Sequence, residues 1–127
     1  MAGTITTTVT KNGALSKYKM DWLSDASGDV DVDAIPMIQG EIQSVHYFPD
    51  AGGTQPSDNY DLTMADSFGV DILTGTGANL SKTTDTYAVP ALSTYFKVVI
   101  EAGSYDLVVA NAGNAKGGIV EVIVRQM

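Results

Sequence analysis

The sequence predicts an all-β fold, a single-domain antiparallel β-sandwich or jelly-roll-like barrel of about eight strands. Apolar and polar residues alternate with a period of two in segment after segment, and no segment sustains the period of an amphipathic helix. The strand candidates are short and are separated by clusters of Gly, Pro, Asn and Asp, which is typical of sandwiches and barrels. The length fits one domain with one core, residues 1–127, in which residues 1–12 form a possible extended N-terminal strand or arm.

The composition of the chain argues against several classes of function. Seven Lys and Arg against fifteen Asp and Glu leave a net charge of −8, and no cationic cluster offers a place for a phosphate backbone, so nucleic acid is not expected as a partner. No apolar run approaches the roughly 18 residues of a membrane-spanning helix, and the N-terminal residues do not have the pattern of a secretory signal. The absence of cysteine excludes disulfides, thiolate metal sites and a cysteine nucleophile. Stability must therefore come from packing and backbone pairing.

Four strand candidates fill the N-terminal part of the chain. "TITTTVT", residues 4–10, is rich in threonine, whose β-branched side chain suits a pleated surface. "SKYKMDWLSD", residues 16–25, alternates large apolar with charged residues, and "GDVDVDAIP", residues 28–36, alternates valines with aspartates. "EIQSVHYFPD", residues 41–50, indicates a strand that stops at Pro49, because proline cannot donate to a ladder.

The stretch "NYDLTMADSFGVDIL", residues 59–73, predicts a β-hairpin. Its two alternating halves flank "DSFG", in which aspartate starts a turn and glycine accepts a positive φ. In this interpretation the aspartates lie on the wet face. Replacing Asp61 or Asp71 by asparagine is then expected to change stability by no more than about 0.5 kcal/mol.

A polar loop containing "TGTGANLSK", residues 74–82, leads to the C-terminal strands. "TYFKVVIEA" and "SYDLVVANA", on either side of Gly103, predict a second hairpin, and "GIVEVIVRQ", residues 118–126, predicts the last strand. The first and the last of these segments are apolar on one face and half apolar on the other. Such a strand is either central and covered or lies at a subunit contact. The candidate interface residues are Tyr95, Val99, Ile119 and Ile123.

The inward positions of these strands predict the core. Its expected members are Tyr18, Met20, Trp22, Leu62, Met64, Phe96, Val98, Ile100, Leu107, Val109, Val122 and Val124.

No catalytic motif stands out. His46 is the only histidine, in "SVHYF" on the face expected to carry Ile42 and Phe48, and a Ser-His-Asp triad would need a serine and a carboxylate delivered to it by the fold. We expect a buried or interfacial histidine instead, no enzyme activity and no cofactor. Asp29, Asp31 and Asp33 are weak metal candidates, because alternate strand residues lie about 6.8 Å apart, too far to cage one ion. A solvated acidic face is the simpler interpretation, and no metal site is expected.

Two stretches together resemble small β-rich virion proteins of tailed bacteriophages, of the capsid decoration or cement type. These are "GGTQPSDNYDLTMADSFGVDILTGTGANLS", residues 52–81, and "YDLVVANAGNAKGGIVEVIVR", residues 105–125. The resemblance covers about half of the chain and includes no catalytic motif, so no functional residue is carried over.

The resemblance implies a protein made in the host cytoplasm that binds the outer capsid surface and stabilises the shell. Its expected partners are the major capsid protein and further copies of itself, with a trimer favoured; a membrane is not expected. Two alternatives remain. The chain could be a glycan- or receptor-binding β-sandwich module of a tail or fibre, or another component of the tail or the head–tail joint.

Overall fold

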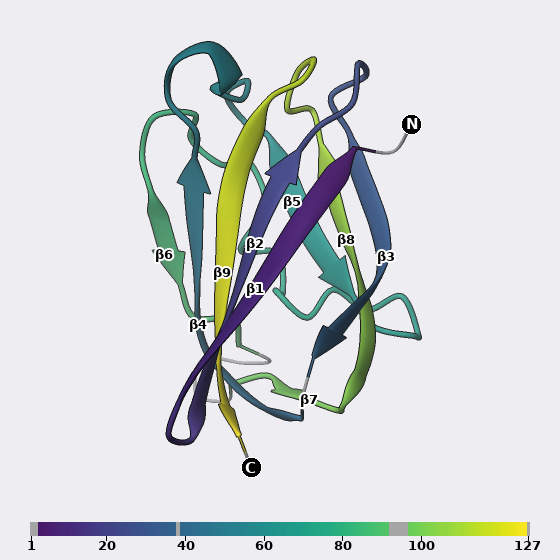
Figure 1. The fold of residues 1–127 in the computed structure, drawn as a ribbon, viewed down its shortest axis with the longest axis vertical. Coiled ribbons are helices and arrows are strands. Elements are labelled where there is room, and N and C mark those ends of the chain that lie inside the picture. Colours follow the sequence, from purple (N-terminus) through teal and green to yellow (C-terminus); the bar gives the residue numbers. More distant parts are fainter. Residues whose placement is uncertain (1–2, 38, 92–96, 127) are drawn as a thin grey trace.

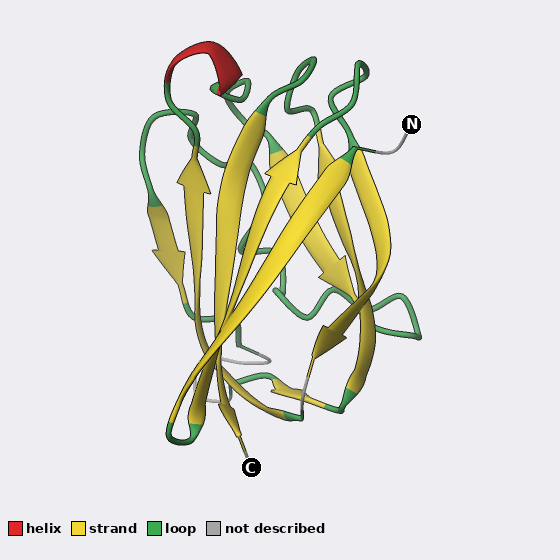
Figure 2. Ribbon diagram, viewed as in Figure 1, coloured by secondary structure: helices red, strands yellow, loops and turns green. Residues whose placement is uncertain are grey.

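The computed structural model describes residues 3–37, 39–91 and 97–126. Across these ranges it contains nine strands and a single turn of 3-10 helix, Gly52–Thr54 (Figures 1 and 2). The strands form two antiparallel sheets packed face to face, so the all-β prediction is confirmed.

The larger sheet carries the N- and C-terminal strands. Its order is β1 (Thr4–Asn12), β2 (Leu15–Leu23), β9 (Gly117–Gln126), β4 (Gly40–Pro49) and β6 (Thr86–Ala88), and β7 (Val99–Ile100) also pairs with β4. The last strand is therefore central, with β2 on one side and β4 on the other (Figure 1). As predicted, β4 ends at Pro49.

The smaller sheet has β8 (Gly103–Ala110) in the middle, with β3 (Val30–Met37) and β5 (Asp61–Ala65) at its edges. The core lies between the two sheets. Every predicted core residue within the described ranges is buried; Phe96 lies outside them. Trp22 of the larger sheet is 1% exposed, and its ring centroid lies 5.6 Å from that of Tyr60, which directly precedes β5.

The predicted hairpin over residues 59–73 has only one strand. After β5 the chain turns, and Asp71 makes a single bridge to Ala65. Residues 71–80 then form a loop that runs back along the free edge of β5, where Leu62 N donates to Gly77 O at 2.8 Å and Leu80 N to Tyr60 O at 2.8 Å. We call residues 71–80 the edge loop.

The aspartates of this region are partly exposed, and their carboxylates accept backbone N–H groups. Asp71 Oδ1 accepts the backbone N–H groups of Met64 and Leu73, each at 3.0 Å, and its Oδ2 accepts that of Gly75 at 3.0 Å. Asp61 Oδ1 likewise accepts the N–H of Asn79 at 2.9 Å. The sequence prediction placed these carboxylates on the wet face, where they are partly exposed, but it did not include their bonds to backbone. Irregular backbone needs acceptors for its N–H groups, and these carboxylates supply them.

The second predicted hairpin, over residues 94–112, is also wrong. Val99 and Ile100 pair with β4 in the larger sheet, whereas β8 pairs with β3 and β5 in the smaller one. The chain crosses from one sheet to the other at residues 101–102. Alternation alone could not show this, because it indicates which face of a strand is apolar but not which strand lies beside it.

A register shift in β4 corrects the expected face of His46. Ile42 lies opposite Val124 and Ser44 lies opposite Ile123, so Gln43 is an extra residue on β4. Such a bulge reverses the alternation beyond it. Ile42 consequently points into the core, whereas His46 and Phe48 share the opposite, outer face.

Candidate functional site

The outer face of the larger sheet brings together side chains from four strands. The register places Tyr87, His46, Glu121 and Lys19 side by side in one row across β6, β4, β9 and β2. The neighbouring rows contain Phe48 beside Ile119, and Ser44 beside Ile123. We call this the outer face; no second layer of the described chain covers it.

Three rings form a cluster on the outer face. The ring centroids of His46 and Tyr87 are 4.7 Å apart, and that of Phe48 lies 5.9 Å from Tyr87 and 6.0 Å from His46. All three contacts are edge-on, the geometry that aromatic quadrupoles favour. Tyr87 is nevertheless 65% exposed. An aromatic residue held in place but left open to solvent is a ready contact for a partner.

His46 joins this cluster to polar neighbours. Its Nε2 lies 3.3 Å from Ser44 Oγ, and its Nδ1 lies 3.7 Å from Glu121 Oε1. Glu121 is also 3.9 Å from Lys17 Nζ. The fold thus delivers to the only histidine both a serine and a carboxylate, in the order found in hydrolytic triads.

The surroundings of these three residues do not suit acyl transfer. The Nδ1–Oε1 separation is longer than a hydrogen bond, so the imidazole is not held by the carboxylate. Ser44 lies within a paired strand of the sheet, whereas acyl transfer needs free N–H donors converging on an oxyanion in a site that excludes water. The arrangement is better suited to fixing the ring of His46 beside Tyr87.

The interface residues predicted from sequence lie on this same face where the structure describes them. Ile119 and Ile123 are half-buried on the outer side of β9, and Val99 is 59% exposed opposite Glu41. Tyr95 lies outside the described residues. Sequence reasoning missed the ring cluster, because Tyr87 and His46 lie far apart in the chain and only the β4–β6 register brings them together. Phe48 could be assigned from the sequence, because it is two residues after His46 and therefore on the same strand face.

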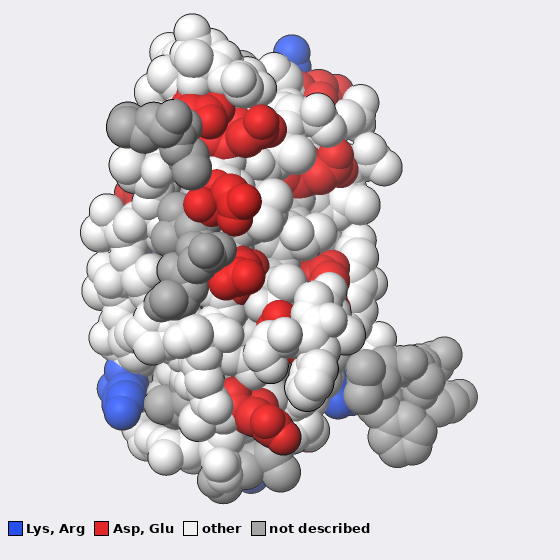
Figure 3. All heavy atoms as spheres, turned by 90° about the vertical axis from the view of Figure 1, so that its right-hand side faces the viewer, with Lys and Arg blue, Asp and Glu red and all other residues white. Residues whose placement is uncertain are grey.

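The smaller sheet carries carboxylates at its outer positions. The outer positions of the smaller sheet include Asp31, Asp61 and Asp106, and Figure 3, which shows the edge of the sandwich at the right of Figure 1, where β3 lies, has carboxylates gathered on it. Asp31 and Asp29 are exposed, and Asp29 N donates to Asp25 Oδ1 at 3.0 Å. The side chain of Asp33 lies outside the described residues. Among described side chains no three potential ligands gather around one point, and the expected lack of a metal site stays a prediction.

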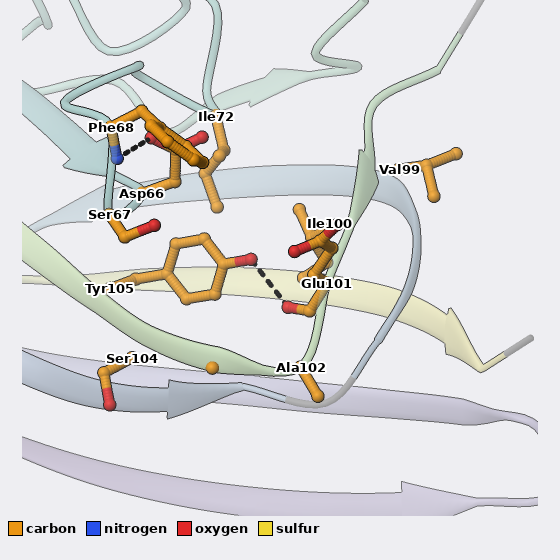
Figure 4. A pocket seen from close by; sticks show the side chains of 11 residues that line it. Asp66, Ser67, Phe68, Ile72, Val99, Ile100, Glu101, Ala102, Ser104 and Tyr105 are labelled. Atoms are coloured by element: carbon orange, nitrogen blue, oxygen red, sulfur yellow. Dashed lines mark hydrogen bonds between the residues drawn. The ribbon is translucent and has the colours of Figure 1, made fainter.

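A cleft of about 290 Å³ opens at the end of the sandwich (Figure 4). Phe68, 89% exposed, lies at its margin, and within it the hydroxyl of Tyr105 donates to Glu101 O at 2.7 Å. Burial raises the pKa of Tyr105. The lining carries carboxylates and hydroxyls but no histidine or lysine among the described residues, so this cleft offers no nucleophile–base pair.

The chain was compared with protein families, curated proteins and solved structures. No family model and no curated protein matches the chain. A solved structure described as that of infectious bursal disease virus, Gx strain, aligns with 97% of this chain and 32% of the other, at 16% identity and a TM-score of 0.31. This chain thus spans about a third of the length of that one, and we draw no conclusion from a similarity at this TM-score. Within the described residues no helix is long and apolar enough to span a membrane.

Proposed function

We propose that this chain is a non-catalytic structural protein of a tailed-bacteriophage virion, a decoration or cement protein that binds the outer capsid surface. The observation that carries this proposal is the contrast between the two sides of the sandwich. The outer face of the larger sheet presents Tyr87, Phe48 and Ile119 beside side chains of both charges, whereas the described outer positions of the smaller sheet carry carboxylates and no Lys or Arg. A protein that coats a shell needs one adhesive side and one side that stays soluble.

The two stretches that resemble phage virion proteins support the same proposal, because part of each contacts the other in the fold. β5 from residues 52–81 pairs with β8 from residues 105–125. Around this pair, Ser57 N donates to Ala112 O at 2.8 Å and Lys116 Nζ donates to Gly53 O at 3.0 Å. The remainder of the second stretch, residues 117–125, lies in β9 at the centre of the larger sheet, so the resemblance includes strands of both sheets.

The outer face is suited to many weak, repeated contacts. A standard protein interface buries about 800 Å² per partner, an area that one face of a small sheet can provide. Repetition over a shell converts modest single-site affinity into avidity. A trimer on the threefold positions of the shell would match icosahedral symmetry, with Val99, Ile119 and Ile123 available for contacts between copies or with the capsid.

The direct test is uptake by expanded heads that lack the protein. Purified protein is mixed with such heads, and copies per head and resistance to heat are measured. We expect stoichiometric uptake by the unaltered protein and loss of uptake by Tyr87→Asp. The matched control is Phe68→Asp, which places the same charge on an exposed aromatic position away from the outer face.

The result distinguishes the possible locations. Uptake at many copies per head supports the cement role. Failure of the unaltered protein to bind heads contradicts it, and recovery of only a few copies per virion would assign the chain to the tail or the head–tail joint.

The absence of catalysis is proposed and can be tested at Ser44. If Ser44 and His46 acted as a hydrolytic pair, Ser44→Ala would remove most of the hydrolysis of an activated ester such as p-nitrophenyl acetate. We expect equal rates for the two proteins, close to the buffer rate. A Ser44-dependent rate would contradict a purely structural role.

The ring cluster also supports a second candidate function, recognition of a host glycan. An exposed tyrosine braced by two further rings can stack on the apolar face of a sugar, and Glu121 lies in the same row to accept hydroxyl hydrogen bonds. Specific binding on a glycan array that Tyr87→Ala abolishes, together with no binding to heads, would favour this function over the capsid role.

A further inference from the structure

The two sheets have edges that the fold protects in different ways. At the free edge of β5, backbone groups are hydrogen-bonded to the edge loop: Leu62 N donates to Gly77 O, and Ile72 N donates to Met64 O. β3, at the other side of the smaller sheet, carries Pro36 and a register shift. β6 and β7, at one side of the larger sheet, have only three and two residues. Cover, proline, irregularity and shortness are the usual protections of an edge.

β1 has none of these four features, and its one charged residue, Lys11, lies next to its last residue. It is nine residues long, with the sequence TITTTVTKN, and its pairing with β2 runs without a register shift from Thr4 to Asn12. It contains no proline and no acidic residue, and almost all of it is exposed. Figure 1 shows β1 beginning beside β3 and diverging from it, so the second sheet does not cover its later half. Val9, on the face that Tyr18 turns to the core, is 44% exposed.

The turn after β1 shows which backbone groups are unpaired. Asn12 and Leu15 flank a two-residue turn whose first residue, Gly13, has a φ of 61°, as in a type II′ hairpin. In such a hairpin the closing pair is hydrogen-bonded, and hydrogen-bonded pairs recur at every second residue. Even-numbered residues of β1 therefore bond to β2, and the N–H and C=O groups of the odd-numbered residues point away from the sheet. These are Ile5, Thr7, Val9 and Lys11.

We propose that β1 pairs antiparallel with β1 of a second copy of this chain, which joins the two larger sheets into one continuous sheet. With the two-fold axis at Thr8, Thr7 lies opposite Val9 of the second copy, and Lys11 lies opposite Ile5. The arrangement sets no like charges directly opposite each other, which would oppose pairing. The unbonded backbone groups at odd positions then satisfy one another.

Charge on the adjacent strands favours the same register. Lys17 lies in the row of Thr10, and Asp21 lies in the row of Thr6. With the axis at Thr8, the row of Thr10 continues into the row of Thr6 in the second copy, so Lys17 faces Asp21 across three strand spacings, about 14 Å. At this range the attraction selects register and orientation more than it adds affinity.

This inference does not depend on the proposed function. The β1 joint has two-fold symmetry, so it predicts a dimer in solution, and the trimer expected from shell symmetry would concern only protein bound to a head. β1 and Tyr87 lie at opposite edges of the larger sheet, so substitutions can test dimerisation and head binding separately. Changes in β1 should abolish self-association, whereas Tyr87→Asp should abolish head binding alone.

The test is sedimentation velocity of the full chain over a range of about 1–100 µM. We expect a monomer–dimer equilibrium for the unaltered protein. Thr7→Pro removes an outward N–H without breaking a bond to β2, and it should weaken dimerisation by at least about tenfold. Thr7→Ala keeps that N–H and is the matched control, which should dimerise as before.

A second variant and a residue-level measurement keep the test valid if Thr7→Pro does not fold. Val9→Lys places a charge on the inner side of the edge and should also give a monomer, whereas Val99→Lys, at the far side of the same sheet, should remain a dimer. Hydrogen exchange should show that the amides of Thr7 and Val9 become protected only at dimeric concentrations, while that of Thr8 is always protected. A monomer throughout this concentration range, or an oligomer unaffected by both β1 variants, would overturn the proposal.

Discussion

The carboxylate of Asp71 accepts hydrogen bonds from three backbone N–H groups. Its two oxygens accept the N–H groups of Met64, Leu73 and Gly75, which ties β5 to the edge loop. An asparagine in its place would keep one acceptor oxygen but turn an NH₂ group towards an N–H donor. We therefore expect Asp71→Asn to lower the free energy of unfolding by roughly 1–3 kcal/mol, in contrast to the neutral outcome expected from sequence.

Urea denaturation measures this loss, and Asp106→Asn is the control. Asp106 lies at an outer position of β8, and no backbone bond to its carboxylate is among the described contacts. Its substitution should change stability by less than about 0.5 kcal/mol. Equal stabilities for both variants would mean that the carboxylate of Asp71 does not hold the edge loop.

Trp22 packs closely against the backbone of the neighbouring strand. It lies opposite Gly118 in β9, and a Cβ at Gly118 would stand 2.8 Å from the indole ring. The indole therefore fills the space that a larger residue would take. Trp22→Ala should reduce the free energy of unfolding by about 3–5 kcal/mol, measured by chemical denaturation. A loss below about 1 kcal/mol would be incompatible with a buried ring.

At the scale of the element, the position of the edge loop depends on the close contact between Gly77 and the backbone of β5. A Cβ at Gly77 would overlap the carbonyl oxygen of Leu62, a backbone atom that cannot move aside without disturbing β5. Gly77→Ala should therefore displace the edge loop, cost about 2 kcal/mol or more, and increase hydrogen exchange at Leu62.

The control for this substitution is Gly53→Ala. Gly53 lies in the single described 3-10 turn, and a Cβ there would meet nothing within 4 Å. The added methyl group should leave stability unchanged or raise it slightly, since alanine restricts the unfolded chain. If both variants unfold alike, the edge loop is not held by contact with β5.

Several tyrosine hydroxyls are buried in the folded protein. We therefore expect its stability to fall at alkaline pH. Burial raises the pKa of Tyr60 to about 12, and burial likewise raises the pKa of Tyr47 and of Tyr105. In the unfolded chain the pKa of tyrosine is about 10. Because the folded pKa is the higher one, the stabilisation is fully present below about pH 10 and is lost as the pH rises towards 12.

Melting temperature measured from about pH 8 to pH 12, with tyrosinate absorbance as a second readout, checks this expectation. Tyr60→Phe removes one of the ionising groups and should make the fall less steep. A melting temperature unchanged across this range would show that these hydroxyls are not buried in solution.

Much of the architecture could be predicted from sequence. The alternation in residues 16–25 and 118–126 correctly indicated strands whose residues Trp22 and Val122 point inward, because one strand face must be apolar wherever a sheet covers a core. The candidate interface positions Ile119 and Ile123 followed from the same periodicity. Their role as contacts, and the virion function itself, stay proposals.

Local periodicity was enough to establish the all-β class, most strand segments and the residues of those strands that face the core. It could not establish which strands lie side by side. The folded chain assigns β7 and β8 to different sheets, turns His46 outward through one extra residue in β4, and brings Tyr87 to it. These outcomes depend on pairings between residues far apart in the chain, and such pairings are selected by the packing of the whole core rather than by any local pattern.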